Sequence, residues 1–158
     1  MGNIFTASEV VQIGIRIEEN GRDFYNTLIS QSKNNRAKEV FKFLASEEKK
    51  HIKVFQGILE KTQEYEPQGL DSDKYFTYMN SLAAEHIFTG KDKGSEIAKS
   101  IKTDKEAVQK GIGFEEDSIV FYEGMKKVVP DFDLKVIDEL ITQEQSHLKQ
   151  LLELKSTL

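Results

Sequence analysis

The sequence predicts an all-α protein, an up-down-down-up four-helix bundle in which two antiparallel helix hairpins are joined by a long crossover. Three observations support this prediction: apolar residues recur at helical spacing in four long segments, two of the three connections are short, and the hairpins resemble one another. Hydrophobic residues make up 38% of the chain and charged residues 31%, a balance typical of amphipathic helices. With a length of 158 residues, we expect residues 1–158 to form a single domain.

The first predicted hairpin comprises helices at about residues 7–31 and 36–63. Residues 6–9, Thr-Ala-Ser-Glu, have the form of a capping box, in which the hydroxyl and the carboxylate each accept a bond from a free backbone N–H. The polar residues 31–35 end this helix, and a second apolar-periodic segment follows directly. Because the connection is so short, the two helices must lie antiparallel.

The second predicted hairpin follows a long irregular connection that is marked by Pro67, Gly69, Gly90 and Gly94. Short helical segments are predicted within this crossover at about residues 74–88 and 95–101. Residues 103–106, Thr-Asp-Lys-Glu, are a second capping box and open a third long helix of about residues 104–128. Pro130 ends it, and Asp131 or Asp133 caps a fourth helix that runs to about residue 155.

Charge and composition exclude several classes of function. The chain carries 22 basic and 27 acidic residues without a basic block, so it lacks the electrostatic signature of nucleic-acid or anionic-membrane binding. It has no cysteine, so a bound metal must be held by Glu, Asp or His. No signal-like N-terminus and no apolar run of the ~18 residues needed for a membrane span are present, so we expect a soluble, cytoplasmic protein.

The two hairpins contain an internal repeat. Residues 14–25 recur as residues 111–122, where Gly-Ile, Glu-Glu and Phe-Tyr pairs keep a constant offset of 97 positions. Residues 44–53 recur as residues 140–149, with Leu, Glu, His and Lys at an offset of 96 positions. The difference of one residue falls in the connecting loops, where length changes are tolerated. The repeat predicts a pseudo-two-fold bundle whose equivalent residues face a shared centre.

Acidic residues lie on the apolar faces of the first and third long helices. Residues three, four and seven positions apart share a helix face. By this count Glu18 lies among apolar residues, whereas Glu19 lies among polar ones. Glu115 is likewise favoured over Glu116 as the buried acid, by a smaller margin. Glu18 and Glu115 are therefore predicted to point into the bundle.

The second and fourth long helices carry one such acid each. Periodicity favours Glu48 over Glu47 only modestly, because both have apolar neighbours. Glu144 is surrounded by apolar residues, whereas Gln143 lies on the polar face. Four carboxylates, one from each helix, are thus predicted to meet in one apolar interior.

Four buried carboxylates require compensating positive charge, because an isolated buried carboxylate is costly and neighbouring ones repel. Two divalent cations would neutralise them, and oxygen and imidazole ligands suit iron or manganese, with zinc possible. His51 follows Glu48, and His147 follows Glu144, at the i, i+3 spacing that puts both side chains over one helical turn. One Glu from each of two helices plus Glu-x-x-His from the other two is the ligand set of ferritin-like dimetal proteins. The alternative is that these residues are ordinary solvated acids and core histidines. It would require the repeated pattern to arise by chance.

These motifs resemble rubrerythrin and its ferritin-like relatives over essentially the whole chain. The resemblance implies a diiron site with glutamates as bridging and terminal ligands and histidines as terminal ligands: Glu18, Glu48, Glu115, Glu144, His51 and His147. Which glutamates bridge the ions stays open. It also implies that Tyr25 and Tyr122 are hydrogen-bond partners of the carboxylates, although as core aromatics they would need no such role.

Two departures from the family bear on the reaction. Full rubrerythrin carries a rubredoxin-like iron site built from cysteines, so this cysteine-free chain would need an external electron donor such as a rubredoxin. Rubrerythrin also has an additional glutamate ligand one turn after the third-helix glutamate, where this sequence has Ser118. The missing glutamate puts efficient peroxidase activity in doubt.

The resemblance implies a redox-active diiron protein that reduces hydrogen peroxide or dioxygen, assembled as a homodimer. The first alternative is a ferroxidase or iron-handling protein without a dedicated substrate. The second alternative is a helical interaction protein that binds no metal.

Overall fold

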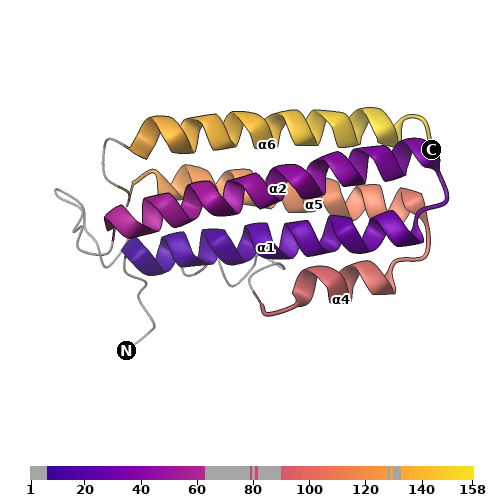
Figure 1. Ribbon diagram of the computed structural model, residues 1–158. Helices are drawn as coiled ribbons and strands as arrows, with labels where there is room; N and C mark the ends of the chain where they lie inside the picture. Colours follow the sequence, from indigo (N-terminus) through magenta and orange to yellow (C-terminus); the bar gives the residue numbers. More distant parts are fainter. Residues whose placement is uncertain (1–6, 63–78, 80, 82–89, 128, 130–132) are drawn as a thin grey trace.

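Four long helices form a bundle with a shorter helix beside it (Figure 1). The computed structural model describes residues 7–62, 79, 81, 90–127, 129 and 133–158. These residues form helices and no strand: α1 (Ala7–Gln31), α2 (Asn35–Thr62), α4 (Lys93–Ser100), α5 (Asp104–Met125) and α6 (Leu134–Lys155). Within this part of the chain, no helix is apolar over a length that could cross a membrane.

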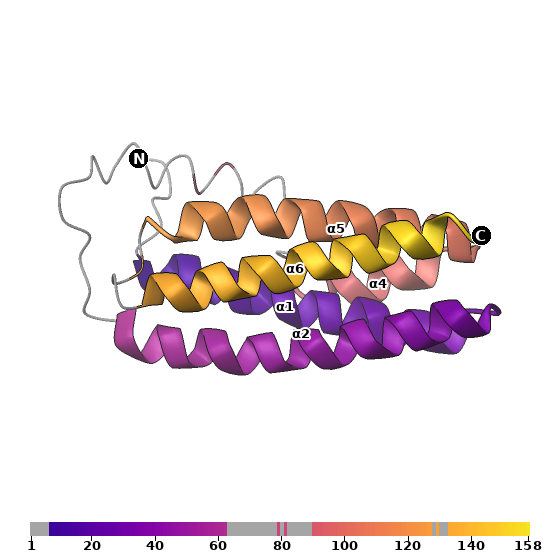
Figure 2. The same cartoon turned by 90° about the horizontal axis from the view of Figure 1, so that it is seen from above.

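The helices run up, down, down and up, as predicted. α1 and α2 form one antiparallel pair, α5 and α6 form the other, and these two pairs make the most extensive contacts between long helices (Figure 1). The two views together place α1 diagonally opposite α6, and α2 diagonally opposite α5 (Figure 2). Each helix therefore presents one face to a centre that all four share.

The helix boundaries agree closely with the predicted ones, with two corrections. α5 ends at Met125 rather than near residue 128, and Pro130, which was expected to end it, lies outside the described residues. Asp133 occupies the N-cap position of α6, but its side chain makes no capping bond. Its backbone is helical (φ −93°, ψ −8°), whereas capping side chains usually extend from a β-region backbone. Asp131, the other capping candidate, is not among the described residues.

The capping boxes were tested only at α5. The Thr103 hydroxyl accepts a hydrogen bond from the Glu106 N–H at 3.1 Å, as predicted. The Glu106 carboxylate accepts from the backbone N–H of Lys102 at 3.4 Å, one residue earlier than a standard box requires. Thr6 of the first box lies outside the described residues, as does nearly all of the helical segment predicted at residues 74–88. The segment predicted at residues 95–101 is confirmed as α4.

Aromatic side chains pack in the bundle core on both sides of its middle. Tyr25 stacks against Phe41 with ring centroids 6.1 Å apart, and Tyr122 packs against Phe55 at 5.1 Å. All four rings are fully buried. One pair lies on each side of the middle of the bundle. Apolar layers therefore separate the middle from both ends.

Asn20 attaches α4 to the outside of α1. Its side-chain amide donates to the carbonyl of Gly90 at 2.7 Å, and its Oδ1 accepts from the Gly94 N–H at 3.0 Å. The backbones approach so closely that a Cβ at Gly94 would lie 1.9 Å from the carbonyl oxygen of Asn20. Glycine at position 94 therefore permits this contact.

Gly94→Ala is expected to destabilise the protein by about 1–3 kcal/mol, because α4 or α1 must move to relieve the overlap. Gly113→Ala is the matched control, since a Cβ there would meet no described atom within 4 Å. An alanine in the middle of α5 should stabilise the protein by roughly 0.5–1 kcal/mol. Urea unfolding of both variants measures the difference. Equal effects at the two positions would contradict the close packing of α4 on α1.

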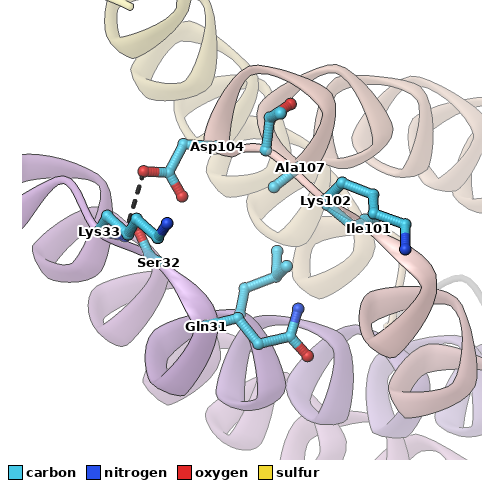
Figure 3. A pocket seen from close by; sticks show the side chains of 9 residues that line it. Gln31, Ser32, Lys33, Ile101, Lys102, Asp104 and Ala107 are labelled. Atoms are coloured by element: carbon cyan, nitrogen blue, oxygen red, sulfur yellow. Dashed lines mark hydrogen bonds between the residues drawn. The ribbon is translucent and has the colours of Figure 1, made fainter.

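Asp104 ties the turn between α1 and α2 to the start of α5. Its carboxylate accepts from the backbone N–H groups of Lys33 at 3.3 Å and Asn34 at 3.0 Å, and Figure 3 shows the bond to Lys33. A cavity of about 250 Å³ lies beside this contact and is lined in part by Gln31 and Lys102. None of the predicted metal ligands lines this cavity.

Candidate metal centre

The six predicted ligands all lie in the middle of the bundle. Each is buried, with exposed fractions between 0% and 2%: Glu18 on α1, Glu48 and His51 on α2, Glu115 on α5, and Glu144 and His147 on α6. The competing acids Glu19 and Glu116 are exposed. Glu47 is half-buried, and its carboxylate pairs with Lys50 at 2.8 Å. The predicted orientations of all four carboxylates are confirmed, including the choice of Glu48 over Glu47.

The ligand atoms fall into two groups that overlap. The first group is Glu18, Glu48, His51 and Glu144, and the second is Glu48, Glu115, Glu144 and His147, with all ligand atoms of a group within 4.8 Å of one another. Glu48 and Glu144 belong to both groups. The arrangement thus singles out these two as the carboxylates able to bridge, which periodicity left open. Glu18 and Glu115 each reach one group.

The polar atoms of this cluster lack partners that could satisfy them. Both carboxylate oxygens of Glu48 and of Glu144, one oxygen each of Glu18 and Glu115, and Nδ1 of both histidines are buried without a hydrogen bond from any described residue. His51 Nδ1 lies 2.7 Å from a Glu144 oxygen, and His147 Nδ1 lies 3.4 Å from a Glu48 oxygen. Unsatisfied buried oxygens cost free energy unless a cation coordinates them. The donor set fits two divalent metal ions of the iron, manganese or zinc type.

The shifted pKa values of the cluster show that burying its charged groups without cations is unfavourable. Burial raises the pKa of Glu48 well above its ordinary value, and the charges of Glu144 and Glu18 raise it further. Burial and the charge of Glu144 likewise raise the pKa of Glu115. Burial alone would lower the pKa of His51, but the charge of Glu18 and the contact with Glu144 raise it to about 11. Without cations, these shifts favour the protonated forms of Glu48, Glu115 and His51.

Glu144 behaves in the opposite way to the other two shifted carboxylates. Burial would raise its pKa, but the close approach of Glu115, His147 and His51 outweighs burial and lowers the pKa. The lowered pKa favours the ionised form of Glu144. Glu144 is also a member of both ligand groups.

The two tyrosines cross-link the helix hairpins through the carboxylates. The Tyr25 hydroxyl of α1 donates to Glu115 of α5 at 2.9 Å, and the Tyr122 hydroxyl of α5 donates to Glu18 of α1 at 2.6 Å. Burial raises the pKa of both phenols, and the neighbouring carboxylates raise it further, so both remain protonated donors. The two interpretations left open by the sequence are thus compatible, since both tyrosines are fully buried core aromatics and also carboxylate partners.

A double-mutant cycle tests this crossed arrangement. Tyr25→Phe combined with Glu115→Gln should show a coupling free energy of about 1–3 kcal/mol, because each single change leaves a buried polar group without its partner. The mismatched pair Tyr25→Phe with Glu18→Gln is the control, and its coupling should be markedly smaller. Guanidinium unfolding of the metal-free variants gives these values. Similar coupling in both cycles would contradict the crossed pairing.

Sequence reasoning missed one polar neighbour of the cluster. Gln143 is exposed, as predicted from its polar helix face, yet its Oε1 lies 2.6 Å from His51 Nε2. Counting residues along one helix cannot reveal a contact that a neighbouring helix makes at its edge. Ser118, which stands where the family has a further glutamate, is fully buried and donates to the Phe114 carbonyl at 2.8 Å.

Comparison with known proteins agrees with this site. The family profile named Rubrerythrin matches residues 9–155. The crystal structure of a ferritin-like diiron-carboxylate protein from Thermotoga maritima is 30% identical in sequence, with a TM-score of 0.72 over 99% of this chain and 98% of that one. A search of curated proteins finds no match. With the profile covering nearly its whole length and the fold shared throughout, the chain belongs to the rubrerythrin family.

Proposed function

We propose that this protein is a diiron-carboxylate oxidoreductase that reduces hydrogen peroxide or dioxygen with electrons from an external donor. The observation that carries the proposal is the pair of overlapping buried Glu/His groups that share Glu48 and Glu144. Two metal ions this close to one another suit a reaction in which both act on one small molecule. Iron is the proposed metal because the donor set suits it and the similar Thermotoga maritima protein is named for two irons.

Each residue has a distinct place in this proposal. Glu48 and Glu144 would be shared by both ions, Glu18 and His51 would complete one site, and Glu115 and His147 would complete the other. When bound, the two irons supply one electron each and act as Lewis acids toward the oxygen species. Reduction of hydrogen peroxide then consumes two electrons and two protons and yields two water molecules.

The surrounding side chains keep the centre dry and orient its ligands. The aromatic layers of Tyr25 with Phe41 and of Tyr122 with Phe55 exclude bulk water from both ends. The two phenol groups hold Glu115 and Glu18 by hydrogen bonds, so these carboxylates keep their orientation when the charge of the centre changes. Removing either hydroxyl would free the carboxylate to rotate.

The electrons must come from outside the cluster, since the chain has no cysteine with which to build an iron–sulfur site. We propose a small one-electron carrier protein such as a rubredoxin as the donor. We also propose that the protein assembles as a homodimer, as the family resemblance implies.

Stopped-flow mixing of the anaerobic ferrous protein with hydrogen peroxide, and separately with dioxygen, tests the function. We expect oxidation of both irons, seen as near-ultraviolet absorption of a ferric pair, at least about 100-fold faster than oxidation of the same amount of Fe(II) mixed with Glu144→Gln, which should hold no pair. Glu139→Gln, an exposed acid on the same helix, is the matched control and should react like the natural protein. Iron that stays ferrous for minutes with both oxidants would refute the oxidoreductase proposal.

Ser118 favours a second candidate function, iron handling. Its hydroxyl is engaged by the helix backbone, so no additional carboxylate is available to change ligands with redox state. A site of this kind could oxidise Fe(II) for transfer or storage. Light scattering after aerobic iron loading separates the candidates, because a mineral-holding shell is a large assembly and the proposed oxidoreductase is a dimer.

A further inference from the structure

The two histidines of the cluster have different neighbours besides the carboxylates. His51 Nε2 lies 2.6 Å from Oε1 of Gln143, which reaches across from α6 to α2. His147 instead meets the ring of Phe43 edge to face, with centroids 6.1 Å apart and an interplanar angle of 87°. One imidazole is thus backed by a hydrogen-bond acceptor and the other by a hydrocarbon ring.

The internal repeat shows that this difference breaks the symmetry of the two hairpins. Gln143 precedes Glu144 just as Glu47 precedes Glu48, and the two positions correspond at the offset of 96. Glu47 pairs with Lys50 at 2.8 Å. The Glu and His ligands occur at equivalent positions in both hairpins. The asymmetry therefore lies in the residues that neighbour these ligands.

The contact with Gln143 determines which nitrogen carries the proton when the His51 imidazole is neutral. An amide oxygen only accepts hydrogen bonds, so Nε2 must carry the proton in the neutral imidazole. Nδ1, which lies 2.7 Å from a Glu144 oxygen and 3.5 Å from a Glu18 oxygen, would then offer its lone pair to an ion that takes the place of its proton. A metal-bound histidine commonly donates its other N–H to a protein acceptor, and this bond fixes the ring and makes it a better ligand.

We propose that Gln143 is a positioning residue that holds His51 ready for metal binding, so that the ion bound by Glu18 and His51 is the tighter of the two. This inference rests on the proposed dimetal centre, and it adds that the two ions of the pair are unequal. Gln143 touches neither ion and acts only through the imidazole of His51.

Titration with Zn²⁺ alone tests the proposal without any turnover. In Gln143→Leu we expect one of the two ions to bind about 10–100-fold more weakly, while the affinity of the other is unchanged. Gln145→Leu is the matched control, because Gln145 is also an exposed glutamine flanking Glu144 on α6. Gln143→Glu keeps an acceptor oxygen at this position and should restore affinity to at least the natural level.

A spectroscopic readout separates positioning from a general loss of structure. In the zinc-loaded protein, NMR should show a His51 Nε2–H proton that exchanges slowly with water, assigned by its absence in His51→Asn. This signal should be lost to fast exchange in Gln143→Leu and persist in Gln145→Leu and Gln143→Glu.

The outcomes distinguish the two proposals. Natural protein that binds two zinc ions, with unchanged affinities or equal losses at both ions in Gln143→Leu, would overturn the positioning role and leave the dimetal centre intact. Natural protein that binds no zinc would overturn both proposals. A selective loss at one ion together with loss of the slowly exchanging proton would establish the role of Gln143.

Discussion

Glu48→Gln and Glu144→Gln are each expected to abolish tight binding of both metal ions, whereas Glu18→Gln and Glu115→Gln should each abolish binding of one. The difference follows from the sharing of Glu48 and Glu144 between the two ligand groups. A neutral amide of nearly the same shape removes the charge that balances the cations while it preserves the packing. Since loss of an outer hydrogen-bond partner already costs roughly 10–100-fold in affinity, loss of a shared ligand should cost more.

Elemental analysis after dialysis against trace metal measures the number of ions that each variant retains. Glu19→Gln and Glu116→Gln are the matched controls, because each changes the exposed acid next to a ligand. Circular dichroism verifies that each variant is helical. Retention of both ions by Glu48→Gln, or loss of both by Glu18→Gln, would show that the ions are not arranged as the two groups indicate.

Removal of the metal is expected to lower the thermal midpoint of unfolding by about 10 °C. A ligand at a thousand times its dissociation constant stabilises the folded state by about 4 kcal/mol. For a chain of this size, each 1 kcal/mol shifts the midpoint by roughly 2–4 °C. Differential scanning calorimetry with and without a chelator measures the shift. An unchanged midpoint would mean that the buried carboxylates are tolerated without cations.

The metal-free and metal-loaded proteins should also respond to pH in opposite directions. The pKa of Glu48 and of Glu115 is raised from the ordinary 4.5 and the pKa of His51 from 6.5, so the folded state binds their protons more tightly than the unfolded chain does. Stability from these groups is fully present at low pH and is lost as pH rises through the raised pKa values. The lowered pKa of Glu144 gives a contribution that is lost only as pH falls below 4.5.

The metal-free protein should therefore become less stable between about pH 5 and pH 8, because over this range the unfolded chain releases protons that the folded state retains. Metal binding needs deprotonated ligands, so the stabilisation that the metal provides should grow over the same range. Urea unfolding at several pH values, with zinc and with chelator, measures both slopes. Parallel slopes would indicate that the metal does not displace protons from these carboxylates.

The helices and the inward acids could be predicted because they depend on local periodicity. Glu18 and Glu144 lie among apolar residues at helical spacing, and the fold agrees with that count. Periodicity separates Glu48 from Glu47 only modestly, since both have apolar neighbours, and the fold decides between them by placing Glu47 against Lys50. Local patterns suffice to predict these features because the buried face of a helix itself produces the hydrophobic periodicity.

Contacts between helices could not be predicted in the same way. Neither the contact of Gln143 with His51 nor the attachment of α4 through Asn20 leaves a periodic signal, because each depends on how two helices are placed side by side. The membership of Glu48 and Glu144 in both ligand groups is of the same kind, since it appears only when the four helices are assembled. The boundary of α5 and the missing cap at Asp133 show that even local signals are least reliable where helices end.

The crossed tyrosine bonds affect the way the bundle is put together. Tyr25 and Tyr122 each reach a carboxylate of the opposite hairpin, so a hairpin on its own has hydroxyl donors without acceptors and acids without donors. Neither hairpin can pair these hydroxyls and carboxylates with each other before it packs against the other hairpin. Docking of the hairpins and assembly of the six ligands are thus one step, and an ion bound at that step would stabilise the docked state by contacting carboxylates of both hairpins.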